Sequence, residues 1–181
     1  MGYKELNTFA FFNLSAKRYL GIAEKLESGY ALDLMSVMVM SAFSVEAYLN
    51  HLGAKKFSDW FSSKEKKSVW EKYKILRKAV GLPPSSLQDA YPDVAAVMDF
   101  RNGMAHGRTE KHAFSFPVEG EVESCLDNPV GWQLHLEHSI VSKRFIACQE
   151  LVKELHAAAG LGNYPFATLA SAASVEPFEG L

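Results

Sequence analysis

The sequence predicts a single, mainly α-helical domain with a small β-hairpin inserted before its last helix. Apolar residues recur at three- and four-residue steps through most of the first 106 residues, which is the spacing of amphipathic helices. The period switches to two between residues 114 and 136 and returns to helical spacing from residue 139. With 181 residues, 48% of them hydrophobic and 22% charged, the chain has the length and composition of one globular domain rather than of a disordered protein.

Two long helices are expected first, over residues 7–28 and 31–52. Ser28 and Gly29 interrupt the periodic pattern between them, and Gly53 ends the second. The second helix is apolar around most of its circumference, which is typical of the central helix of a core.

Residues 55–80 carry nine basic and three acidic residues, so this segment is +6 in a chain whose net charge is −2. We expect a short turn near 57–61 and a helix over 64–80. Its basic and aromatic residues fit two interpretations. The segment either holds single-stranded RNA by phosphate contact and stacking, or it is a solvated helix with Trp60, Trp70 and Tyr73 packed inward.

The second half begins with a helix over 92–106, because Pro92 suits a first helical position and Gly107 suits the position after the end. Alternating apolar residues then predict a hairpin at about 113–138, followed by a last helix over 139–159. The domain is thus expected to span 1–159, with a loosely docked tail at 160–181.

The composition argues against several classes of protein. Two cysteines, Cys125 and Cys148, cannot form a disulfide framework or a four-thiolate zinc site and fit a reducing compartment. Residues 1–5 lack the features of a signal peptide, and the apolar stretch 31–49 contains Asp33 and Glu46. We therefore expect a cytoplasmic protein without a membrane partner.

Two charged residues occupy helix faces where the pattern calls for apolar ones. Arg101 shares a face with Met98 and Met104, and Glu46 is the only charged residue between Asp33 and Lys55. An unpaired buried charge is costly, so we expect Arg101 and Glu46 to pair. The pair either ties two helices together or belongs to a functional site.

His106 extends the functional interpretation. It follows Arg101 by five residues, which is about 140° around a helix and about 7.5 Å along its axis. Where the helix unwinds into Gly107, the two side chains could converge on one phosphodiester. A histidine at a helix C-terminus also serves simply as a cap.

The segment Arg101-Asn102-Gly103-Met104-Ala105-His106 resembles the signature of the HEPN superfamily, in which Arg and a polar residue precede a His near a helix end. The segment 44–50, with Glu46, resembles the acidic motif of the preceding core helix in that superfamily. The resemblance covers about residues 7–159 and implies an up-and-down helical bundle that dimerises through the motif helices. The hairpin lies outside the minimal four-helix core.

Many HEPN members are metal-independent endoribonucleases of toxin–antitoxin, phage-defence or RNA-processing systems, whereas others are non-catalytic binding modules. The resemblance implies that His106 is the acid/base residue and that Arg101 contacts phosphate. Asn102 would assist them, and Glu46 with Asn50 would support Arg101. Three further residues are candidates for phosphate or RNA contacts: Arg108, Lys111 and His112.

The resemblance also implies a homodimer, RNA as substrate, and an antitoxin or nucleotidyltransferase as a protein partner. We expect no cofactor and no metal. The pair His135 and His138 would lie on opposite faces of a strand, and this argues against a metal site there. A purely structural helical dimer tied by Arg101 and Glu46 is the remaining alternative.

Overall fold

The computed structural model describes residues 4–26, 28–107, 111 and 131–172. It is mainly helical, as predicted. The long helices are α1 (Thr8–Ala23), α2 (Ala31–Lys56), α5 (Pro92–Ala105) and α6 (His138–Ala158). Two shorter ones are α3 (Val69–Ala79) and α4 (Leu87–Ala90).

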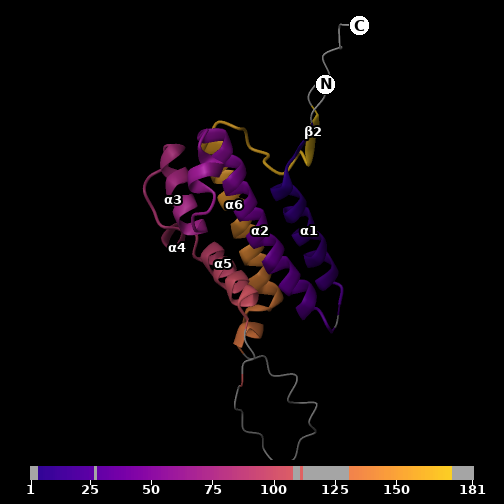
Figure 1. Cartoon of the computed structure of the whole chain (residues 1–181). Coiled ribbons are helices and arrows are strands. Elements are labelled where there is room, and N and C mark those ends of the chain that lie inside the picture. The colour runs from indigo at the N-terminus through magenta and orange to yellow at the C-terminus, as the bar shows by residue number, and fades with distance from the viewer. Residues whose placement is uncertain (1–3, 27, 108–110, 112–130, 173–181) are drawn as a thin grey trace, which may run out of the picture.

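Helix α2 is the centre of the bundle. It packs against α1, α3, α5 and α6, and Figure 1 shows it running between α1 on one side and α5 with α6 on the other. The inward residues of α2 are almost fully buried, among them Leu34, Val37, Val45 and Leu49. By length and composition alone, helix α2 is long and apolar enough to cross a bilayer. However, half of its most apolar 18-residue stretch is buried inside this bundle.

In the basic segment, residues 55–80, the regular helix begins later than the sequence pattern predicts. Residues Trp60–Lys64 form a π-helical turn, and α3 starts only at Val69. The start is fixed by a capping box, in which Ser68 Oγ accepts the backbone N–H of Glu71 and the Glu71 carboxylate accepts the backbone N–H of Ser68.

Gly53 explains how the π-helical turn docks on α2. The buried indole of Trp60 lies directly on the helix backbone at this position, and a Cβ added to Gly53 would lie 2.1 Å from Trp60 Cε2. Glycine is therefore required here for close approach rather than as a helix terminator. The predicted end of the helix at Gly53 is wrong, because α2 continues to Lys56.

The prediction of a strand over residues 132–136 is wrong. Residues Gly131–His135 form a 3-10 turn that leads into α6, and the first half of the predicted hairpin lies outside the described residues. In a 3-10 turn, side chains three apart lie on one side, so Trp132 and His135 both face α5 while Leu134 is exposed. Alternation alone could not separate these two conformations.

A short antiparallel pair, β1 (Lys4–Leu6) and β2 (Ala170–Ala172), joins the two ends of the described chain. Lys4 pairs with Ala172 and Leu6 with Ala170. The pairing lies beside the start of α1, where the Asn7 backbone N–H also donates to Leu169 O at 2.9 Å. Part of the segment after Gly160 is thus attached to the domain by backbone hydrogen bonds.

Candidate functional site

Arg101 on α5 and Glu46 on α2 form the predicted ion pair. Arg101 Nη2 donates to Glu46 Oε2, and Nη1 donates to Asn102 Oδ1 at 3.0 Å. The Arg101 side chain is 22% exposed and that of Glu46 is 32% exposed, so the pair lies at the edge of the core. Arg101 Nε is buried and has no hydrogen-bond partner within the described part of the chain.

A third charge, which the sequence did not suggest, completes this cluster. Lys72 on α3 is only 2% exposed, and its Nζ lies 3.4 Å from Glu46 Oε1. Each carboxylate oxygen of Glu46 therefore faces a different cation. One negative and two positive charges leave the group with a net charge of +1, whereas Arg101 and Glu46 alone would be neutral.

Aromatic rings cover the apolar side of this charge cluster. The Arg101 guanidinium lies over the ring of Phe43, 5.9 Å from its centroid. The centroids of the Phe43 ring and the Phe12 ring of α1 are 5.5 Å apart. A cavity of about 280 Å³ opens here, lined by these two rings and by Glu46, Ala47 and Asn50. Asn50 Oδ1 is 3.4 Å from the indole N–H of Trp60, so Asn50 joins the site to the π-helical turn.

His106 caps the C-terminus of α5 and is exposed. Its backbone N–H donates to Asn102 O at 3.1 Å, so helical spacing persists to this residue. Asn102 and His106 are four positions apart and therefore share a face, and Asn102 also accepts from Arg101. Within the described residues no contact joins Arg101 to His106 directly, but Asn102 accepts a hydrogen bond from each of them.

The remaining predicted contact residues are only partly covered. Lys111 is exposed, whereas Arg108 and His112 lie outside the described residues. His135 and His138 lie in two environments: His135 Nδ1 is 3.3 Å from Arg144 Nη1, and the ring centroids of His138 and Tyr30 are 4.7 Å apart. The two imidazoles thus have different neighbours.

The structure favours the packing interpretation of segment 55–78 over the RNA-stacking one. Trp60 and Tyr73 are fully buried and cannot stack on bases at the surface. Four of the cations in this segment have carboxylate partners, in the pairs Lys64–Asp59, Lys67–Glu71, Lys72–Glu46 and Arg77–Glu154. Four of the nine cations in the basic segment are therefore held in ion pairs.

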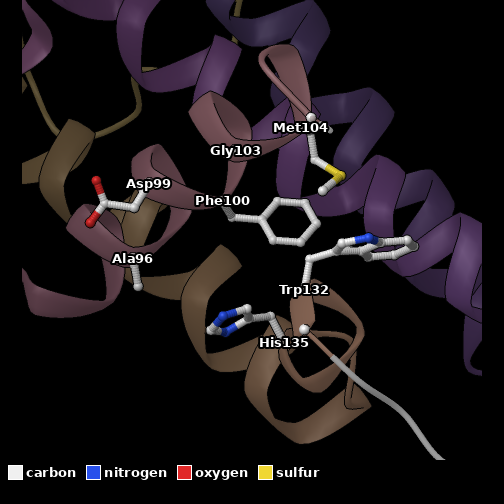
Figure 2. A pocket seen from close by; sticks show the side chains of 9 residues that line it. Ala96, Asp99, Phe100, Gly103, Met104, Trp132 and His135 are labelled. Atoms are coloured by element: carbon white, nitrogen blue, oxygen red, sulfur yellow. The ribbon is translucent and has the colours of Figure 1, made fainter. Parts of the chain in front are cut away.

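A second cavity, which the sequence analysis did not predict, lies beside α5 (Figure 2). It has a volume of about 420 Å³ and lies between α5 and the 3-10 turn. Phe100, Met104, Trp132 and His135 surround it, and Gly103 forms part of its wall. The only advance signal was a glycine inside the motif helix, because the turn that supplies Trp132 and His135 was expected to be a strand.

Comparison of the chain with protein-family models, with curated proteins and with solved structures finds no match.

Proposed function

We propose that this protein is a metal-independent endoribonuclease of the toxin, defence or RNA-processing type. The observation that carries the proposal is the net positive cluster of Arg101, Lys72 and Glu46, whose Arg101 lies in the last turns of α5, the helix that the exposed His106 caps. A net positive charge and an exposed imidazole supplied by one helix are groups that can hold a phosphodiester and move a proton.

The reaction needs no external nucleophile. The 2′-hydroxyl of the substrate loses its proton to a base and its oxygen bonds to phosphorus, while the bond from phosphorus to the 5′-oxygen breaks and that oxygen takes up a proton. The products are a 2′,3′-cyclic phosphate and a 5′-hydroxyl. In this mechanism the imidazole of His106 takes part in these proton transfers, and Arg101 neutralises charge on the phosphate oxygens.

Two proton-transfer groups are better supplied by two subunits. A two-fold homodimer through the motif helices would bring a second His106 to the same phosphate. The accessible face of α2 supports this assembly, because Val39, Met40 and Phe43 are only partly buried in one subunit. Both the homodimer and the cleavage of RNA are parts of this proposal.

The test is cleavage of a structured and an unstructured RNA in the presence of excess EDTA. Replacing His106 by Ala is expected to lower the rate by about 10²–10⁴-fold. Arg101→Ala should lower it to a similar degree, and His138→Ala serves as a control, because this histidine packs against Tyr30 at the start of α6. If His106→Ala and Arg101→Ala both cleave RNA at the wild-type rate, the mechanism is rejected. Products that lack a cyclic phosphate would also reject it.

A non-catalytic binding module is the second candidate. It is favoured by one observation: within a subunit Arg101 is held by Glu46 and Asn102, and none of its described contacts reaches His106. Such a module would bind RNA, a nucleotide or a protein such as an antitoxin or nucleotidyltransferase without cutting. Tight RNA binding by the wild-type protein, with no cleavage at any protein concentration tested, would select this candidate.

A further inference from the structure

The cavity between α5 and the 3-10 turn has the shape and composition of a ligand site. Among the described residues it is a partly open cavity with a volume of about 420 Å³. In Figure 2 the Phe100 ring and the Trp132 indole face the same space, with the Met104 thioether beside the indole and the imidazole of His135 below the Phe100 ring. The Phe100 and His135 rings meet edge to face with centroids 6.2 Å apart.

Gly103 keeps this space open. It lies inside α5, where glycine is less favourable than alanine. Packing does not require a glycine there, because a Cβ built at Gly103 meets no atom within 4 Å. The missing side chain faces the cavity instead. A glycine that weakens its helix and leaves a hollow is better explained by an occupant than by close packing.

The walls select a flat, largely apolar occupant with a polar edge. Aromatic and thioether groups stabilise a planar ring by stacking and dispersion. The carboxylate of Asp99 lies at the rim, turned away from the rings, where it can accept from an N–H donor but would repel a phosphate. His135 is held in place by Arg144, whose Nη1 is 3.3 Å from His135 Nδ1.

We propose that this cavity binds one unstacked nucleobase of single-stranded RNA, whose phosphate lies outside it toward His106. His106 follows Gly103 by three residues, or about 4.5 Å along the helix, so a base in the cavity and a phosphate at the helix end fit one nucleotide unit. The choice of RNA rests on the proposed function. The cavity itself would set base preference around the cut site.

Binding is measured apart from cleavage with a fluorescently labelled, random-sequence RNA hexamer that carries 2′-O-methyl groups and therefore cannot be cut by 2′-attack. Gly103→Leu adds a side chain whose Cβ meets no atom within 4 Å and improves helix propensity, so the fold is expected to persist. We expect it to weaken hexamer binding at least tenfold. The matched control is Gly103→Ala, which leaves most of the cavity open and should stay within about threefold of wild type.

A second variant keeps the test independent of any disturbance at Gly103. Trp132→Ala removes the largest stacking surface and is also expected to weaken binding about tenfold, within the range measured for base–aromatic stacking. Asp99→Asn should change the ranking among A-, C- and U-hexamers, because an amide both donates and accepts whereas a carboxylate only accepts. Inorganic phosphate alone should not compete for the cavity.

The outcomes separate this inference from the proposed nuclease activity. Unchanged hexamer binding by folded Gly103→Leu and Trp132→Ala overturns the base pocket, even if the wild-type protein cleaves RNA. Failure of the wild-type protein to bind any hexamer overturns it too. Conversely, binding that both variants lose, in a protein that never cleaves, supports the pocket and rejects the nuclease.

Discussion

Lys72 and Glu46 form an ion pair in which the cation is the more deeply buried partner. Lys72 is 2% exposed and Glu46 is 32% exposed, with Nζ and Oε1 3.4 Å apart. Glu46 has a second partner in Arg101, whereas Glu46 is the only ion-pair partner of Lys72 within the described residues. The Glu46 carboxylate therefore holds one cation from α3 and one from α5 close together.

This asymmetry predicts unequal costs for removing either partner. Glu46→Gln leaves the ammonium of Lys72 buried without a counter-charge, and we expect it to lower the free energy of unfolding by about 3 kcal/mol. Lys72→Met leaves Glu46 paired with Arg101 and should cost about 1 kcal/mol. Urea denaturation measures both values, and an equal or larger loss for Lys72→Met would contradict the prediction.

Glycines in α1 and α2 should respond oppositely to alanine. In Gly53→Ala the new Cβ would overlap the Trp60 indole, so we expect a loss of at least about 2 kcal/mol in the free energy of unfolding. Gly21 in α1 has no atom within 4 Å of an added Cβ, and Gly21→Ala should stabilise the protein by about 0.5–1 kcal/mol. Thermal melting of the two variants side by side tests this, and a shift of both in the same direction would refute it.

His156 should make stability depend on pH. Burial lowers the pKa of His156 below its ordinary value, and nearby Lys55 acts in the same direction while the backbone of Leu161 opposes it. The unfolded chain then binds more protons than the folded one below about pH 6.5. The contribution of this residue to stability is therefore complete above that pH and is lost as the pH falls toward the lowered pKa.

The measurement is the free energy of unfolding between pH 7.5 and 5 for the wild-type protein and His156→Phe. Other groups titrate in both proteins, so the informative quantity is the difference between the two curves. We expect the wild type to lose more stability than the variant as the pH falls. The variant also lacks the contact between Tyr48 Oη and His156 Nδ1 at 3.2 Å, which adds an offset that changes little with pH above 6.5. Parallel curves would exclude His156 as the source.

Arg77 is expected to be irreplaceable by lysine. Its Nη1 lies 2.9 Å from both Glu154 Oε2 and Tyr73 Oη, and its Nε donates to Pro83 O at 2.6 Å. A lysine ammonium cannot reproduce the planar arrangement of these donors. Arg77→Lys should therefore cost about 2 kcal/mol of unfolding free energy.

Lys78→Arg is the matched control for this exchange, because Lys78 is exposed on the same helix. It should leave the free energy of unfolding unchanged within about 0.5 kcal/mol. If Arg77→Lys behaves like the control, the three contacts of Arg77 do not stabilise the protein.

The sequence by itself determined the four long helices and one side of the site. Strong helical periodicity, Pro92 at the start of α5 and the apolar surface of α2 each reflect local or one-dimensional constraints, so their positions could be read from residue spacing. The same reasoning paired Glu46 with Arg101, because a charge on an apolar face needs a partner and each was conspicuous in its own helix.

Only the tertiary structure decided the rest. Lys72 lies among other lysines in the sequence, and nothing local distinguishes the one that becomes buried against Glu46. The 3-10 turn at 131–135 shares its apolar alternation with a strand, and its conformation depends on packing against α5. Burial and the meeting of distant segments are set by the whole chain, and for that reason the third charge and the cavity beside Gly103 emerge only in three dimensions.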